Sequence, residues 1–145
     1  MQARAFLVGL FSLLISDLVY ATSYQLPLEV SLTKSGEVCV CVSSRIDRDG
    51  RGVKLQSISF DDPSISPWSP IWALYAEGSD AEPVKCFTYG RPVGGLTQHV
   101  APAALQVDKP YRIEVSRPGE NGVLYFKLLT KGNHVHVVEL DKSGL

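Results

Sequence analysis

The feature that most constrains the fold is an alternation of apolar residues with a period of two. It is clearest at residues 26–32, where Leu26, Leu28, Val30 and Leu32 occupy every second position. Side chains alternate between the two faces of a β-strand, whereas an amphipathic helix repeats every 3.6 residues, and no window shows that longer repeat. Segments of this strand-like kind, rich in Val, Ile, Leu, Tyr and Phe, are 26–32, 38–43, 53–60, 71–76, 84–89, 110–116, 123–129 and 134–140.

Short polar or Gly/Pro-containing connections separate these segments, which follow one another at spacings of about ten residues. The longest irregular stretch is 90–102, with a Gly94-Gly95 pair and two prolines. Asp61 and Asp62 precede Pro63, which cannot donate to a β-ladder, so the pair is interpreted as a turn that ends a strand. The pattern predicts an all-β fold, an antiparallel immunoglobulin-like β-sandwich of about seven to eight strands.

The N-terminus has the pattern of a signal peptide covering residues 1–21. Arg4 precedes an apolar run over residues 5–15, and Val19 and Ala21 are the β-branched and small residues at the −3 and −1 positions that a signal peptidase recognises. The run is shorter than the ~20 residues that cross a bilayer. No cysteine lies near the cleavage point, so no lipid anchor is expected. We expect a mature chain of one domain, residues 22–145, that is periplasmic or secreted and has no membrane anchor.

The three cysteines predict one disulfide and one free thiol. Cys39 and Cys41 lie two residues apart in a strand pattern, so both face the same side, and Cys86 is far away in the sequence. An exported compartment favours oxidation, and a bridge between Cys39 and Cys41 has poor geometry. Cys86 is therefore expected to bond to either Cys39 or Cys41, and the remaining thiol to be a small buried hydrophobic group.

Composition argues against several classes of function. Arg4 and Asp17 leave with the signal peptide, so the 14 basic and 15 acidic residues of the full chain become 13 and 14. This balance argues against a nucleic-acid partner, which requires a concentrated basic face. No nucleophile elbow and no phosphate-binding glycine loop is present, so no catalytic residue, enzymatic activity or cofactor is predicted.

Two patterns resemble metal sites, although no metal site is predicted. His134 and His136 share one face of a strand and, with His99, could form a three-histidine zinc site. Val138 and Leu140 continue that face, however, which is typical of a half-buried sheet surface. Residues 47–50 resemble the start of a calcium loop but lack its later carboxylates, so a hairpin loop is the better interpretation.

Two residues are candidates for binding a partner protein. Trp68 lies between two prolines in the loop 64–70, and Arg91 lies in the irregular stretch 90–102. Tryptophan is frequent at binding hot spots, and arginine can bind a carboxylate through two hydrogen bonds. Trp72 is assigned to the core instead, and Trp68 has the alternative role of covering the open end of the core.

Residues 105–115, Leu-Gln-Val-Asp-Lys-Pro-Tyr-Arg-Ile-Glu-Val, resemble the tyrosine corner of fibronectin type III and related immunoglobulin-like domains. In that motif a Leu, here Leu105, lies six residues before the Tyr, here Tyr111. The resemblance implies that the Tyr111 ring fills the core while its hydroxyl caps the preceding crossover.

The order of short motifs is similar to that of the periplasmic immunity proteins of type VI secretion systems. These motifs are Gly36-Glu37-Val38-Cys39-Val40, then Val84-Lys85-Cys86-Phe87, then Lys109 to Val115. The resemblance implies that Cys39 and Cys86 form the disulfide, and that the partner is a toxin neutralised by protein–protein occlusion. Members are usually lipid-anchored, so this chain would be a soluble relative. A non-catalytic immunoglobulin-like structural or accessory module of the periplasm or cell surface, and a histidine-based metal-binding domain, remain alternatives.

Overall fold

The computed structural model describes residues 24–43, 49–65, 69–78 and 81–141. The signal peptide, Trp68 and residues 47 and 48 of the possible calcium loop lie outside this part. The described chain contains β-strands and no helix, so the all-β prediction is confirmed. Accordingly, no helix of the described part is long and apolar enough to cross a membrane. The strands are β1 (Tyr24–Gln25), β2 (Leu28–Leu32), β3 (Val38–Val42), β4 (Val53–Lys54), β5 (Ser57–Asp62), β6 (Ser69–Ala76), β7 (Pro83–Val84), β8 (Cys86–Thr88), β9 (Leu96–Val100), β10 (Pro110–Arg117), β11 (Glu120–Lys131) and β12 (His134–Leu140).

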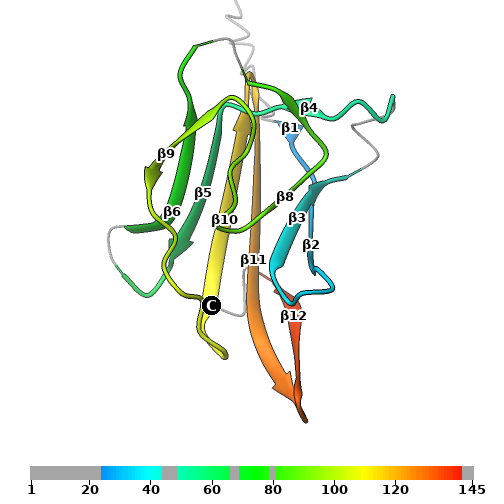
Figure 1. Ribbon diagram of the computed structural model, residues 1–145, viewed down its shortest axis with the longest axis vertical. Helices are drawn as coiled ribbons and strands as arrows, with labels where there is room; N and C mark the ends of the chain where they lie inside the picture. Colours follow the sequence, from blue (N-terminus) through cyan, green and yellow to red (C-terminus); the bar gives the residue numbers. More distant parts are fainter. Residues whose placement is uncertain (1–23, 44–48, 66–68, 79–80, 142–145) are drawn as a thin grey trace, which may run out of the picture.

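Seven of the strands form one large sheet in the order β1-β11-β10-β5-β6-β9, with β12 also pairing with β11. The twelve-residue β11 pairs with β1 near its start and with β12 along its second half. The β1–β11 pair is parallel and the other pairs of this sheet are antiparallel. In Figure 1 the far ends of β11 and β12 extend beyond the rest of the molecule.

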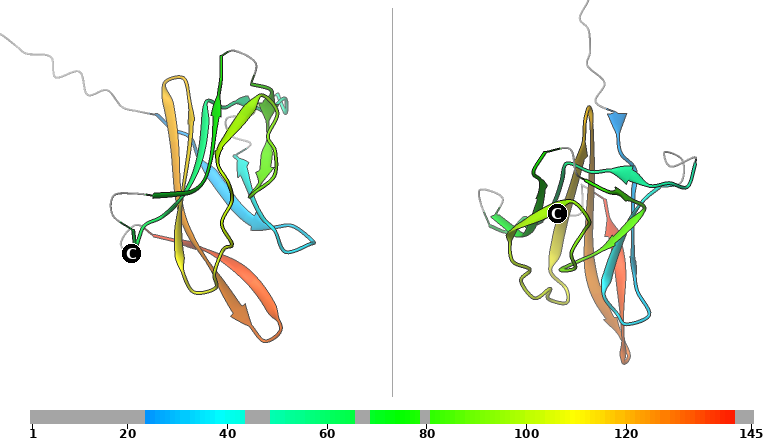
Figure 2. Two further views of the ribbon diagram at one scale, coloured as in Figure 1. Left: turned by 60° about the vertical axis from the view of Figure 1, so that its left-hand side comes forward. Right: turned by 45° about the horizontal axis from the view of Figure 1, so that its top comes forward.

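The small sheet has the order β2-β3-β8 and lies against one face of the large sheet, as Figures 1 and 2 show. The chain passes from β1 in the large sheet to β2 in the small one beside Gly122 of β11. A Cβ at Gly122 would lie 2.4 Å from the carbonyl oxygen of Leu26, so only glycine allows this approach. A third, two-stranded sheet joins β4 to β7.

One apolar core fills the space between the two larger sheets. Val38, Val40 and Val42 of β3 face inward, and Phe87 of β8 lies beside them. Opposite them Phe60 of β5 makes aromatic contacts with residues of both sheets, which are Trp72 at 5.5 Å, Phe126 at 6.1 Å and Phe87 at 6.5 Å between ring centroids. Each buried side chain of this size contributes about 1.5–3 kcal/mol, so this core is the main source of stability. Trp72 lies in it, as the sequence predicts.

The strand assignment differs from the sequence prediction in several places. The described residues form twelve strands instead of seven to eight. The predicted strands 53–60 and 84–89 each correspond to two strands, β4 with β5 and β7 with β8, and β1 and β9 are additional. Strand β9 lies inside residues 90–102, which were predicted to be irregular. It pairs with β6 alone, and its Thr97, Gln98 and His99 are exposed, so it has no buried face to impose an alternation. Asp61 lies in β5 and not in a turn, whereas Asp62 ends β5 and begins a turn in which the backbone N–H of Ile65 donates to the carbonyl oxygen of Asp62 at 3.2 Å.

Candidate functional site

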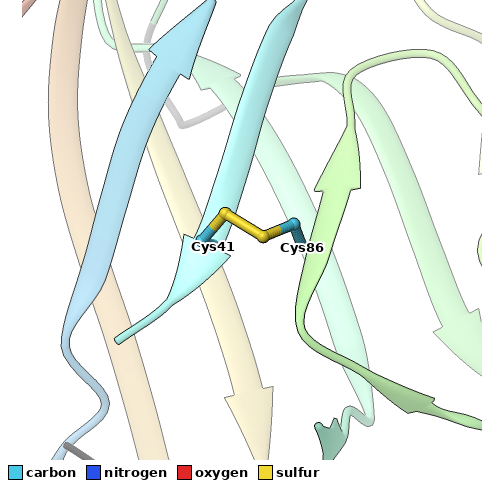
Figure 3. The surroundings of a disulfide bond; sticks show 2 residues. All are labelled: Cys41 and Cys86. Carbon is cyan, nitrogen blue, oxygen red and sulfur yellow. A yellow bond between two sulfur atoms is a disulfide. The ribbon is translucent and has the colours of Figure 1, made fainter. Parts of the chain in front are cut away.

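The disulfide joins Cys41 to Cys86, with an S–S distance of 2.06 Å and a Cα–Cα distance of 4.0 Å. The pairing of Cys39 with Cys86 that the family resemblance implied is therefore wrong. The physical reason is the register of the small sheet, in which Cys41 lies directly opposite Cys86 (Figure 3). Cys39 lies opposite Thr88 instead. The sequence restricted the choice to Cys39 or Cys41, and only the register decides between them.

Cys39 keeps a free thiol and is partly exposed, so it is not the buried hydrophobic group that we expected. The valines of β3 alternate with the two cysteines, and the valines take the inward positions. Both cysteines therefore point away from the core, on the outer side of the small sheet.

The Tyr111 side chain forms the hydrogen bond that the tyrosine-corner interpretation expects. Its ring is buried beside Phe126, at 5.6 Å between centroids, and its hydroxyl oxygen accepts the backbone N–H of Gln106 at 2.7 Å. Leu105 is partly buried and packs against the same core. These contacts tie the crossover that precedes β10 to the interior.

A second polar contact holds the same crossover to the end of β5. Asp62 is 2 % exposed and forms an ion pair with Lys109. Its Oδ1 accepts hydrogen bonds from the backbone N–H of Ser64 at 2.9 Å and from the Ser64 hydroxyl. Burial alone would raise the pKa of Asp62, but the hydrogen bonds from Lys109 and Ser64 outweigh it and lower this pKa below its ordinary value.

The side of the large sheet that faces away from the core carries polar side chains together with an exposed Tyr and an exposed Val. Tyr111, Ile113 and Val115 of β10 point inward, so their neighbours Arg112 and Glu114 point outward. The registers of β5, β6 and β11 add further residues to this side. We call it the outer face and define it by Ser57, Ser59, Asp61, Tyr75, Arg112, Glu114 and Val123.

Arg112 is the centre of the outer face. Its Nη1 donates to Asp61 Oδ2 at 2.9 Å, and its Nη2 forms an ion pair with Glu114. Ser59 donates to the other oxygen of Asp61 at 2.7 Å. Burial disfavours the charged guanidinium, but the bonds to Glu114 and Asp61 outweigh this and raise the pKa of Arg112. The guanidinium is therefore held in a fixed position and stays charged.

Two shallow hollows adjoin Arg112 on this side. One, of about 420 Å³, lies over Ser57, Ser59, Asp61 and Tyr75, and a larger one, of about 850 Å³, lies beside Val123, Tyr125 and Glu139. Tyr75 and Val123 are 41 % and 43 % exposed, which is high for residues of this size. The sequence alone does not predict this site. The alternation at 110–116 indicates an outward Arg112, but the strands beside it depend on the sheet order.

Arg91, one of the two predicted partner-binding residues, lies between β8 and β9 and binds Glu37. Its Nε and Nη2 both donate to Glu37 Oε1, at 2.9 and 2.6 Å. Hydrogen bonds from Arg91 and Ser35 lower the pKa of Glu37. The Arg91 side chain is 65 % exposed, so it remains accessible while it binds a carboxylate of its own chain. Arg91 lies outside the outer face.

The structure does not bring the three histidines together. His99 lies on β9, where it contacts Tyr75 and approaches Glu77 with 3.5 Å between Nε2 and Oε1. His134 and His136 lie on β12. In the sheet order β12 and β9 are separated by β11, β10, β5 and β6, which corresponds to five strand spacings of about 4.8 Å. Within the described ranges, no group of potential metal ligands contains a histidine.

No family model matches the chain, and no curated protein or solved structure has significant similarity to it.

Proposed function

We propose that the chain is an exported, disulfide-bonded binding protein of the immunity type, which neutralises a toxin by covering part of its surface. The observation that carries this proposal is the outer face. An exposed Tyr and an exposed Val lie there on either side of a fixed Arg. Tyrosine and arginine are the residue types that most often dominate binding energy.

The rigidity of this face supports a binding role. Arg112 is fixed by Asp61 and Glu114, so little side-chain entropy is lost when a partner covers it. The strands beneath it pack on the core through Phe60 and Ile113, which are fully buried. A preorganised surface of this kind binds with a smaller ordering cost than a loop does.

The charges of the outer face indicate the chemistry of the partner. Among the residues that define the outer face, Arg112 carries one positive charge and its partners Asp61 and Glu114 carry two negative charges. The side therefore has an acidic excess around its apolar contacts. It fits a partner surface with lysine or arginine side chains around an apolar centre. The toxin identity of that partner comes from the family resemblance.

Binding measurements on matched variants test the proposal. The tagged protein is exported in its native cell, and proteins that co-purify from the periplasmic extract are identified, starting with toxins encoded beside its gene. Tyr75→Ala is expected to weaken such a complex by about thirtyfold, which corresponds to ~2 kcal/mol. Val123→Ala should weaken it as well, whereas Val107→Ala should not, although both valines are 43 % exposed.

Two results would contradict the proposal. One is that no neighbouring toxin binds the protein or is neutralised when the two are co-expressed. The other is that a toxin binds and all three variants retain full affinity, which would place the contact elsewhere and leave the outer face without this role. A protein that assembles with structural components of the envelope instead would favour the accessory-module alternative.

We also propose that the two facing sheets are a variant of the immunoglobulin-like sandwich, supported by the Tyr111 corner, and that the mature chain begins near Thr22 outside the cytoplasm. The Cys41–Cys86 disulfide favours a compartment that is not the reducing cytoplasm. N-terminal sequencing of the exported protein tests the cleavage site, and an intact residue 1 would exclude it. A crystal structure with a different strand order would exclude the immunoglobulin-like classification.

A further inference from the structure

Three sulfur atoms meet on the outer side of the small sheet, although one disulfide uses only two. The Sγ atoms of Cys39, Cys41 and Cys86 all lie within 4.8 Å of one another. Cys41 and Cys86 are bonded, so the thiol of Cys39 lies beside an existing disulfide. Cys86 is exposed and Cys39 is partly exposed, so solvent reaches the group.

The local sequence explains why the three sulfurs come together. The alternation Val38-Cys39-Val40-Cys41-Val42 places both cysteines of β3 on one side, and its three valines anchor that orientation in the core. The β3–β8 register then places Cys86 opposite Cys41 and diagonal to Cys39. On the neighbouring strands Glu29, Ser31 and Thr88 share this side, and Glu29 is the titratable one among them.

We propose that Cys39 is an internal nucleophile that moves the disulfide of Cys86 from Cys41 to itself. The Cys39 thiolate attacks Sγ of Cys86, a new bond forms between Cys39 and Cys86, and the bond between Cys86 and Cys41 breaks with its electron pair going to Cys41. Cys41 leaves as a thiolate and takes up the proton that Cys39 lost. No oxidant or reductant is consumed, and the chain has one disulfide and one thiol before and after.

Attack on Cys86 is favoured over attack on Cys41 by backbone geometry. A Cys39–Cys41 bond would join residues i and i+2 of one strand, whose Cα atoms are separated by about 6.6 Å, close to the limit for a disulfide. The exchange therefore has one acceptor, Cys86, and two alternative partners on β3. In both forms the bond still connects β3 to β8.

The packing of β8 makes Cys41–Cys86 the major form. Phe87 is buried in the core, and the Tyr89 hydroxyl donates to the carbonyl oxygen of Ala103 at 2.7 Å. The backbone N–H of Tyr89 also donates to the carbonyl of Val38 at 2.8 Å. These contacts hold Cys86 opposite Cys41, so the bond to Cys39 has to form diagonally, in a minor population.

Slow alkylation of the folded protein tests the exchange. The purified, oxidised chain is incubated for hours at pH 8.5 with a low concentration of iodoacetamide, without added thiol. It is then digested in acid, and fragment ions separate label on Cys39 from label on Cys41. One label per chain is expected, mostly on Cys39 with a detectable fraction on Cys41. Label on Cys39 alone would overturn the proposal.

Two variants provide the controls. In Cys39→Ser the nucleophile is absent, so no label is expected on Cys41; label there would mean that the bond opens without Cys39 and would also overturn the proposal. In Cys41→Ser, Cys39 is expected to bond to Cys86 in a buffer of oxidised and reduced glutathione, which leaves no free thiol. Two free thiols in that variant, with a retained β-sheet spectrum, would show that the diagonal bond cannot form. Neither readout depends on a partner protein, so this inference can fail while the proposed function stands, or the reverse.

Discussion

In the large sheet the central strands are long, eight residues in β10 and twelve in β11, whereas β8 of the small sheet has only three. A long ladder supplies many backbone hydrogen bonds to hold its register, and a three-residue strand supplies few. The small sheet has a covalent bond where its ladder is shortest, between Cys41 and Cys86. The large sheet has polar side-chain contacts instead, from Tyr111 and Asp62 to the crossover before β10. The comparison indicates that the covalent bond compensates for a short ladder.

Among the substitutions that test this comparison, removal of the disulfide is expected to change the free energy of unfolding most. Cys86→Ala should lower the free energy of unfolding by about 4 kcal/mol, since the bond closes a loop with a sequence separation of 45. Cys86 is exposed, so little packing is lost with its side chain. Urea denaturation measures the change.

The matched control for this prediction is Cys39→Ala on β3, two residues before Cys41. It removes a thiol from the same side of the small sheet and leaves the disulfide intact, so stability should change by less than about 0.5 kcal/mol. Equal losses in the two variants would show that side-chain packing, and not the covalent bond, holds the small sheet.

Tyr111→Phe, in the large sheet, should lower the free energy of unfolding by an intermediate amount. The change keeps the ring and its contact with Phe126 but removes the acceptor of the Gln106 N–H. The expected cost is about 1–3 kcal/mol, because a part-buried donor loses its hydrogen bond. Thermal and urea unfolding measure it. Tyr125→Phe is the comparison, since that Tyr is also buried on the adjacent strand; an equal effect would remove the special role of the corner.

The sequence predicts the parts of this fold in which one face of a strand is buried. The inward positions Tyr111, Ile113 and Val115 impose a period of two on β10, and the prediction of a strand at 110–116 follows. Strand β9 has no such signal, because its polar central residues are exposed at an edge. The alternation of apolar residues therefore predicts strands that bury one face, and it does not predict an edge strand such as β9.

Sites that depend on register could not be predicted for a different reason. The choice of Cys41 over Cys39 requires the alignment of β3 with β8, which no single segment contains. The outer face requires the order β11-β10-β5-β6, which places Asp61 beside Arg112 across 51 residues of sequence. The local sequence alone predicts that Asp61 lies in a turn, because Pro63 follows closely.

The smallest expected effect is that of an Asp62 substitution on the melting temperature, and this effect depends on pH. The folded-state pKa of Asp62 lies below the ordinary value of 3.8, so the ionised form stabilises the fold. This contribution is fully present above the unfolded-state pKa and is lost as the pH falls through the lower, folded-state pKa. Asp62→Asn should therefore lower the melting temperature at pH 7, by about 2–5 °C, and the difference from the wild type should narrow below pH 3.8.

A substitution of Lys109, the ion-pair partner of Asp62, tests whether the charge of Asp62 stabilises the fold. Lys109→Gln removes the cation while Ser64 still donates to the Asp62 carboxylate, so it should reproduce part of the effect with the same narrowing at low pH. Melting curves of the three proteins between pH 3 and pH 7 measure both changes. A loss from Asp62→Asn that is as large at pH 3 as at pH 7 would show that the shape of the side chain matters and its charge does not. The crossover would then be held by Tyr111 and by packing. The small sheet would still be held by its covalent bond, and the hydrogen bond from the Gln106 N–H to Tyr111 would be the polar side-chain contact that stabilises the crossover of the large sheet.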